Sequence, residues 1–354
     1  MLLIAWLAVA FWLFLQWQSP AAAPQAASVP AASAPRTSSL PGLPAEPSAP
    51  AAIVAQRPAS APARTVLVES DVHRLTIDLD GVSIVRAELK DYPLEKTPGS
   101  PNVVLLDDTG ADYYVAQSGW LTRTGAAPTH EARFRTADGK NAYRMAEGED
   151  TLEVPFVWED PNGVQLTKTL VLKRGRYDIG IRQEISNRAA TPWAGYAYEQ
   201  LKRVAPPPPP THAGLTNPDA FSTVGAAWYS PQDNFEKLKF TDYLDDGVLQ
   251  SPDKAAKGGW FGMLEHHFVS VWLPDGDDTQ TVSTAIEGEG AQAQYIVRGV
   301  AGETTVAPGA SVSREDTLWI GPKAQAGMAG VHPTLELSVD YGIFSFLAQP
   351  LFWA

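Results

Sequence analysis

The chain has 354 residues, a formal net charge of −13, a pI of about 4.9 and no cysteine. An acidic chain without a cluster of Lys and Arg is not typical of nucleic-acid-binding proteins, because phosphate contacts need clustered cations, so no nucleic-acid partner is expected. Without cysteine, neither disulfide bonds nor thiolate chemistry is available.

Residues 1–18, MLLIAWLAVAFWLFLQWQ, carry no charge. As a helix they would be about 27 Å long, close to the ~30 Å hydrocarbon core of a bilayer. The run is longer than a signal-peptide core and no basic segment precedes it, while Trp12 and Trp17 suit a membrane interface. We predict one uncleaved transmembrane anchor. A cleaved signal peptide is the alternative, because small residues follow in SPAAAPQAA.

Residues 19–64 contain ten prolines in 46 residues, mostly interleaved with Ala and Ser. Such a segment cannot bury enough apolar surface to fold, so it is predicted to be a disordered Ala/Pro-rich linker. As a flexible coil its ends would lie ~40 Å apart on average.

Residues 65–330 are predicted to form an all-β domain. Turn signals at Asp80–Gly81, Asp160–Gly163 and Arg174–Gly175 separate runs of matching apolar pattern, which is typical of hairpins. The sequence offers about seventeen strand candidates and no convincing long amphipathic helix. That many strands do not stay in one open sheet, so stacked antiparallel sheets are expected.

Residues 258–274, GGWFGMLEHHFVSVWLP, hold two adjacent histidines. Apolar residues on both alternating faces predict one long strand, buried on both sides. Such a strand sends His266 and His267 to opposite faces, so they cannot share a metal ion. Glu265 and His267 share a face about 7 Å apart, but two ligands do not complete a zinc site. Neither a metal nor another cofactor is expected.

Other candidates for chemistry have plainer structural interpretations. The acidic groups Asp107–Asp108, Asp245–Asp246 and Asp275–Asp278 sit in turn contexts, where solvated carboxylates are usual. No nucleophile elbow, P-loop or dinucleotide-binding glycine motif is present, so no catalytic residue is assigned and the chain is not expected to be an enzyme. Several tryptophans are predicted to lie in the sheet core, with a sugar-stacking cleft as the alternative: Trp158, Trp193, Trp228, Trp260, Trp272 and Trp319.

The most specific motif is at the end, GPKAQAGMAGVHPTLELSVDYGIFSFLAQPLFWA, residues 321–354. In GPK, LELSVDYG and QPLF it resembles YidC-type bacterial membrane protein insertases, at the junction between the periplasmic domain and the membrane-embedded core. The stretches YSPQDNFEKLKF (229–240), KGGWFGMLEHHFVSVWLP (257–274) and LTKTLVLKRG (166–175) also look like that periplasmic domain.

This resemblance implies a β-supersandwich, a galactose mutarotase-like fold, for residues 65–330. It implies insertion, folding and assembly of inner-membrane proteins, alone or with the Sec translocon, as an insertase and chaperone. The implied partners are nascent inner-membrane proteins, the Sec translocon with its accessory subunits, and the lipid bilayer. The implied location is the bacterial inner membrane, with the main domain in the periplasm.

The family's insertion groove lies in a later helical core, so its residues cannot be assigned here, and we expect a fragment of a longer protein rather than a truncated gene product. Residues 331–354 would be the junction and the start of an interfacial helix lying in the membrane plane. Pro350 fits the first turn of such a helix. The candidate membrane-interface contacts are Phe344, Phe346, Leu347, Leu351, Phe352 and Trp353.

Two alternatives remain open from the residues alone. A membrane-tethered carbohydrate-binding or aldose-epimerase-like protein would need an acid and a base facing one cleft. Glu265 and His267 are the best available pair, with Glu199 in reserve. A scaffold that docks a Sec accessory protein through a sheet edge is the other possibility.

Overall fold

The computed structural model describes residues 65–207, 223–252, 254–276 and 278–339. The predicted anchor, the predicted linker and the candidate membrane-interface contacts from Phe344 to Trp353 lie outside these residues. No helix among the described residues is both long and apolar enough to cross a membrane.

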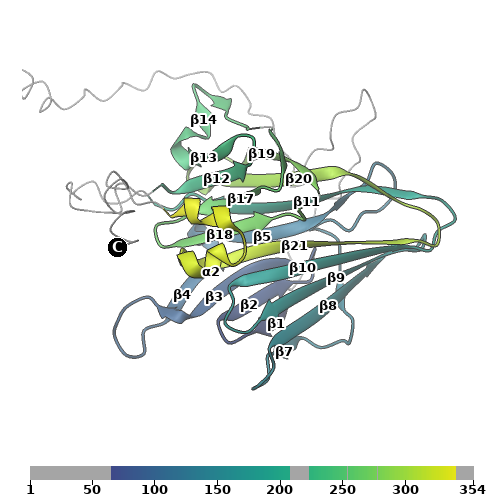
Figure 1. Ribbon diagram of the computed structural model, residues 1–354, viewed down its shortest axis with the longest axis horizontal. Helices are drawn as coiled ribbons and strands as arrows, with labels where there is room; N and C mark the ends of the chain where they lie inside the picture. Colours follow the sequence, from purple (N-terminus) through teal and green to yellow (C-terminus); the bar gives the residue numbers. More distant parts are fainter. Residues whose placement is uncertain (1–64, 208–222, 253, 277, 340–354) are drawn as a thin grey trace, which may run out of the picture. The chain divides into compact units, whose positions relative to one another are not determined.

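Two large sheets make up most of the described chain (Figure 1). The ten-stranded sheet has the order β16 (Lys254–Lys257), β19 (Thr279–Glu287), β20 (Gln294–Val306), β11 (Trp193–Val204), β5 (Tyr114–Leu121), β4 (Asn102–Asp107), β3 (Ser83–Pro93), β2 (His73–Asp78), β1 (Thr65–Glu69), β7 (Ala142–Arg144). The nine-stranded sheet has the order β13 (Asn234–Lys239), β12 (Gly225–Ser230), β17 (Trp260–Leu264), β18 (Phe268–Leu273), β21 (Ser311–Pro322), β10 (Asp178–Asn187), β9 (Val164–Lys173), β8 (Thr151–Glu159), β6 (Arg135–Thr136).

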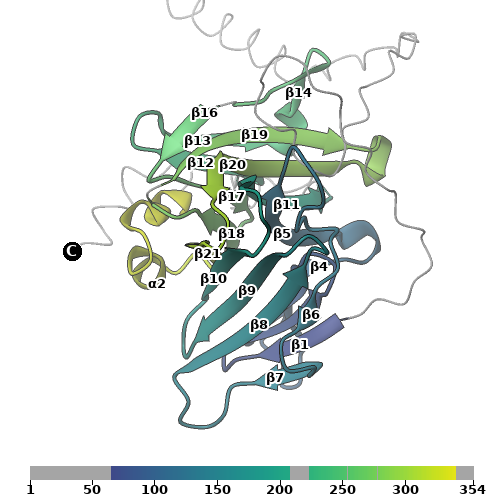
Figure 2. The same ribbon diagram turned by 90° about the vertical axis from the view of Figure 1, so that its right-hand side faces the viewer.

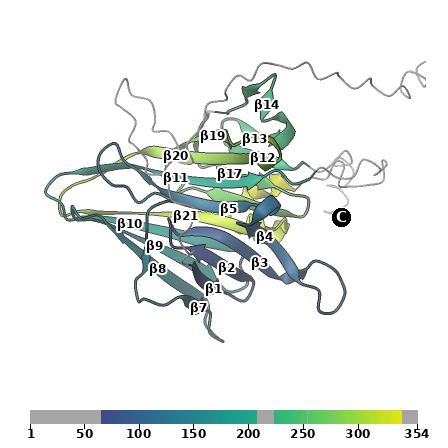
Figure 3. The ribbon, with the colours of Figure 1, turned by 180° about the vertical axis from the view of Figure 1, so that it is seen from behind.

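The remaining elements are short. They are the hairpin β14 (Leu244–Asp245) and β15 (Val248–Leu249), the 3₁₀ turns η1 (Gly110–Asp112), η3 (Phe240–Asp242), η4 (Gly290–Gln292) and η5 (Pro333–Ser338), and the helix α2 (Gln325–Ala329). Figure 3 shows β5, β3, β2 and β1 of the ten-stranded sheet from behind. Strand pairing is antiparallel except between β1 and β7. The prediction of an all-β domain with stacked sheets is confirmed.

The three predicted hairpin turns join the strands that they were expected to join. Gly81, Gly163 and Gly175 all have positive φ, at 73°, 101° and 70°, and lie between β2 and β3, β8 and β9, and β9 and β10. Glycine adopts this backbone conformation without steric cost. At Gly81 a Cβ would also come within 2.1 Å of the Cα of His130, so only glycine fits there.

The prediction of one strand over residues 258–274 is wrong. The segment forms the hairpin β17–β18, in which Phe261 pairs with Trp272 and Leu264 with Val269. Glu265, His266 and His267 form its turn, and the two imidazole rings lie with centroids 4.0 Å apart rather than on opposite faces. The apolar pattern was right for both strands, but a tight turn without glycine, proline or asparagine gave no sign of the reversal.

Four of the expected tryptophans lie in the main core, whereas Trp260 and Trp319 lie in a second cluster on the outer face of the nine-stranded sheet. The six tryptophans predicted for the core are all buried, between 1% and 8% exposed, so they offer no stacking face for a sugar. Polar side chains also cross from one sheet to the other. His73 donates from Nε2 to the carbonyl of Ile320 at 2.7 Å, and Trp120 donates from Nε1 to Oε1 of Gln183 at 3.0 Å. Hydrogen bonding makes their burial tolerable.

The chain enters and leaves the sheets at opposite ends. Thr65 of β1 pairs with Asp78, beside the turn that contains Gly81. At the other end β21 finishes at Pro322, and α2 follows directly. Figure 2 shows α2 beside β18 and β21, on the outer side of the nine-stranded sheet.

Candidate functional site at the C-terminal junction

Residues 323–339, here called the C-terminal junction, pack on the outer face of the nine-stranded sheet. Met328 of α2 and Leu335 of η5 are fully buried, in a cluster that includes Trp260, Val271 and Trp319. Two fully buried aliphatic side chains stabilise such a contact by about 1.5–3 kcal/mol each. The junction is therefore part of the folded domain, although it lies outside the two sheets.

The local sequence explains how the junction folds. Gly327 lies against the indole of Trp319, where a Cβ would come within 3.1 Å of the ring. Pro333 occupies the first turn of η5, where its missing N–H is not needed. His332 caps η5, because its side chain accepts from the backbone N–H of Thr334. These residue types could have predicted a short capped turn from the sequence.

The turn between β17 and β18 holds the start of the junction. The carbonyl of His267 accepts from the backbone N–H of Lys323 at 2.9 Å. Within the same turn, Oε1 of Glu265 lies 2.6 Å from Nη1 of Arg203, whose guanidinium lies 4.4 Å from the ring centroid of Tyr114. Glu265 is thus the counter-ion of a nearly buried arginine. This pairing does not fit the role of general acid or base in the alternative enzyme hypothesis.

No metal site forms around this turn. Across the part of the chain that the structure describes, no group of three or more His, Cys, Asp or Glu is placed to hold a metal ion. The two adjacent imidazoles are close enough to touch, but two ligands do not satisfy a structural zinc ion.

A second candidate region, here called the inter-sheet polar layer, consists of Glu199, Gln280, Arg314, Asp316 and Lys168. Glu199 accepts from Nε2 of Gln280 at 2.8 Å and lies 3.3 Å from Nη2 of Arg314. Arg314 also donates from Nε to Asp316 at 3.1 Å. Burial, together with the nearby Asp316 carboxylate, raises the pKa of Glu199 to about 8. Glu199, the second candidate acid of the alternative enzyme hypothesis, is therefore fully buried between the sheets.

Besides Arg314, the inter-sheet polar layer contains a second basic side chain, Lys168 of β9. Its Nζ donates to the carbonyl oxygens of Gly81 and Ser118, at 2.8 and 2.9 Å, and to Oγ of Ser118 at 3.1 Å. Burial lowers its pKa to about 7. In LTKTL the lysine shares a strand face with Leu166 and Leu170, so the alternation places it on the buried face although its charge suggests solvent.

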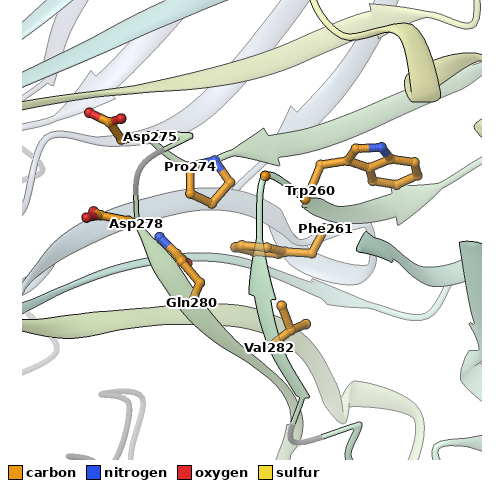
Figure 4. A pocket seen from close by; sticks show the side chains of 9 residues that line it. Trp260, Phe261, Pro274, Asp275, Asp278, Gln280 and Val282 are labelled. Carbon is orange, nitrogen blue, oxygen red and sulfur yellow. The ribbon is translucent and has the colours of Figure 1, made fainter. Parts of the chain in front are cut away.

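A small cavity lies beside the layer (Figure 4). It has a volume of about 10 Å³, which is room for one water molecule. Phe261, Pro274 and Gln280 surround it, while the indole of Trp260 points away. Its polar side chains are already engaged, since Asp278 pairs with Arg314 at 3.0 Å. This cavity is too small to hold a sugar.

Comparison with known proteins identifies the family. A family model described as the YidC periplasmic domain matches residues 65–354. The chain belongs to the YidC family. The membrane protein insertase YidC of Xanthomonas euvesicatoria pv. vesicatoria is 38% identical over 379 residues, which cover 99% of this chain and 63% of that protein. The YidC insertase of Stenotrophomonas maltophilia is 37% identical, with 99% and 62% covered.

The resemblance to YidC found in the motifs is therefore confirmed, and these YidC relatives are named as insertases rather than as enzymes. The chain spans about 63% of the length of the curated relatives that it matches.

Solved structures give a weaker similarity. A galactose mutarotase related protein from Lactobacillus acidophilus has a TM-score of 0.41 and 10% identity, covering 72% of this chain and 97% of its own. A putative aldose 1-epimerase from Escherichia coli K12 also has a TM-score of 0.41, with 9% identity, covering 72% and 98%. No functional statement about this chain follows from values of this size.

Proposed function

We propose that the chain is the periplasmic portion of an inner-membrane protein insertase. In this proposal residues 1–18 are the anchor, residues 19–64 the linker and residues 65–330 a β-supersandwich, while residues 331–354 lead into the membrane. The observation that carries it is the junction, because a YidC-family domain here holds its C-terminal segment firmly against the sheet through Met328 and Leu335. A firm exit point suits a domain attached to a membrane-embedded partner.

The position of Thr65, where the first strand begins, suggests why a long linker (residues 19–64) would precede the domain. The first strand begins at the end of the sheets that lies away from α2. If both chain ends are held at one membrane, the linker must reach from the membrane to Thr65, and a coil of residues 19–64 has a mean span of ~40 Å.

The proposed activity is to aid insertion, folding and assembly of nascent inner-membrane proteins, alone or with the Sec translocon and its accessory subunits. The names of the relatives support the insertion step, and the roles as chaperone and as Sec partner extend it. Residues Phe344 to Trp353 would contact the lipid surface on the periplasmic side.

A complementation experiment tests this function. The full-length gene is supplied to bacteria depleted of their own insertase, and the membrane-inserted fraction of a small inner-membrane protein is measured by protease accessibility. We expect insertion to return. A fraction that stays at the depleted level, with the protein present in the membrane, would overturn the proposal.

Two matched variants test the part played by the junction. Leu335→Ser removes a fully buried contact, whereas Leu337→Ser changes a side chain that is 44% exposed on the same short turn. We expect insertion to fall with the first variant and to persist with the second. Protease resistance of residues 65–322 shows whether the sheets remain folded in both.

The anchor is tested separately. The N-terminus of the protein from washed membranes is sequenced, and we expect it to lie at the start of residues 1–18. A mature N-terminus within residues 20–30 would instead identify a cleaved signal peptide.

A further inference from the structure

A chain of hydrogen bonds ties the junction to the nine-stranded sheet. Nε1 of Trp260 donates to Oγ1 of Thr334 at 3.0 Å, and this oxygen lies 2.8 Å from Nδ1 of His332. The backbone N–H of Thr334 also donates to Nδ1 of His332, at 3.3 Å. Because an indole can only donate, the hydroxyl of Thr334 accepts from Trp260 and gives its own hydrogen to His332.

This arrangement fixes the protonation state of His332. Two donors of Thr334 point at Nδ1, so that nitrogen carries no hydrogen and the ring is neutral with its hydrogen on Nε2. A protonated ring has an N–H at both nitrogens. The backbone N–H of Thr334 would then face another N–H, and the cap of η5 would be lost. The hydroxyl of Thr334 could accept a hydrogen bond from the protonated ring of His332, but its own hydrogen would then have to point elsewhere.

The surroundings of His332 also favour the neutral ring. Burial lowers its pKa from the ordinary value near 6.5. Its ring lies against that of Tyr229 of β12, with centroids 6.4 Å apart. The elements that pack around the junction also carry titratable or charged groups. They are Tyr229 of β12, Glu236, Lys237 and Lys239 of β13, Glu265, His266 and His267 of the β17–β18 turn, Arg176 (paired with Asp178 at 2.6 Å) and Tyr177 of the β9–β10 turn, Lys323, and Glu336 of η5.

We propose that His332 is a pH-sensitive latch, which holds η5 on β17 while its ring is neutral and loosens it when the ring is protonated. The latch is closed above pH 6.5. Its contribution is lost as the pH falls below 6.5, because the loosened segment takes up a proton more readily than the packed one. Acidity would thus weaken the link between the sheets and the residues after Val339. The latch involves described residues alone and stands independently of the proposed function.

Two variants separate the latch from other effects of acid. His332→Asn keeps an acceptor at the cap, since asparagine is among the best N-cap residues, but it does not titrate. His267→Asn removes an exposed imidazole from the turn that contacts Lys323 and leaves the latch intact. It is the matched control, because it changes the same residue type beside the same segment.

Hydrogen exchange followed by mass spectrometry tests the latch in the full-length protein in detergent micelles. Exchange is measured at pH 7.5 and 5.0, with rates corrected for their intrinsic pH dependence. We expect hydrogen-exchange protection of residues 331–339 in the native protein to fall about fivefold at pH 5.0. This factor corresponds to the stabilisation that one N-cap residue gives a helix. His267→Asn should show the same loss and His332→Asn none.

Two results would overturn the latch. One is unchanged protection of residues 331–339 in the native protein at pH 5.0. The other is an equal loss in His332→Asn, which would assign the acid effect to another group.

Discussion

The inter-sheet polar layer and the C-terminal junction are held in place by different physics. In the layer, ionisable groups such as Glu199 and Arg314 are removed from water and depend on one another. In the junction, apolar side chains such as Met328 and Leu335 cover the outside of a sheet, with one hydrogen-bond chain at the surface. The first region joins the two sheets, whereas the second attaches a short segment to one of them.

This difference predicts how each region fails. Removing one member of a buried charge network leaves its partners unpaired in a low dielectric, so the whole domain is destabilised. Removing one apolar contact from a covering segment exposes only that contact, so the segment can open while the sheets stay folded. The predictions below test this contrast, from the largest expected effect to the smallest.

Arg314→Met should cause the largest loss. It removes the cation that Glu199, Asp316 and Asp278 share, and breaking such a buried set costs about 3–5 kcal/mol of unfolding free energy. Urea denaturation of the purified protein measures the loss. Arg182→Met on the same sheet is the control, because its side chain is 44% exposed, and it should change stability by less than about 0.5 kcal/mol. Equal losses in both variants would contradict a special role for the layer.

Acid should weaken the sheets in a defined window. Burial lowers the pKa of His73 to about 4 and that of His130 to about 3, so both take up a proton on unfolding below pH 6.5. Glu199, whose pKa is raised to about 8, releases one on unfolding above pH 4.5. These three groups give a net uptake of about one proton, which should lower stability by about 1.4 kcal/mol per pH unit between 6.5 and 4.5, and protonation of His332 adds to this fall.

Urea titrations at pH 6.5, 5.5 and 4.5 measure this slope. His130→Gln removes one of the two imidazoles, so uptake and release should nearly cancel and the slope should flatten. A slope that stays the same in this variant would show that His130 is not one of the groups responsible.

Leu335→Ala should act locally. Truncating a fully buried leucine costs about 2–3 kcal/mol at a site that can partly relax. Because the junction lies outside the sheets, the cost should appear as lost hydrogen-exchange protection over residues 325–339, while the main urea transition moves little. Leu337→Ala is the matched exposed control. If the main transition shifted by the full amount, the junction would be as cooperative as the sheets.

Chelation should have the smallest effect. The Glu265–His267 turn contacts the start of the junction, and the structure gives it two adjacent imidazoles and an ion pair with Arg203 rather than a ligand set. The melting temperature should therefore be the same with and without a chelator. A fall of many degrees would show that a metal ion contributes to folding.

Local patterns in the sequence predicted much of the fold. Alternating apolar residues and the turns at Gly81, Gly163 and Gly175 predicted hairpins, and the strand count predicted stacked sheets. The same approach failed at Glu265–His267, because both strands of that hairpin are apolar on both faces and the turn lacks the usual residues. The apolar pattern therefore could not distinguish one long strand from two shorter strands joined by a turn.

By itself, the sequence determined the fold class, the hairpin turns at Gly81, Gly163 and Gly175, and the family, because these depend on neighbouring residues and on motifs such as GPKAQAGMA. Only the tertiary structure decided where the charges and the histidine act. Glu199 meets Gln280 and Arg314 from 81 and 115 positions away, and Trp260 meets Thr334 from 74 positions away. Sheet order brings such residues together, and it is set by the packing of the whole domain, so no local pattern reveals what the buried polar residues will contact.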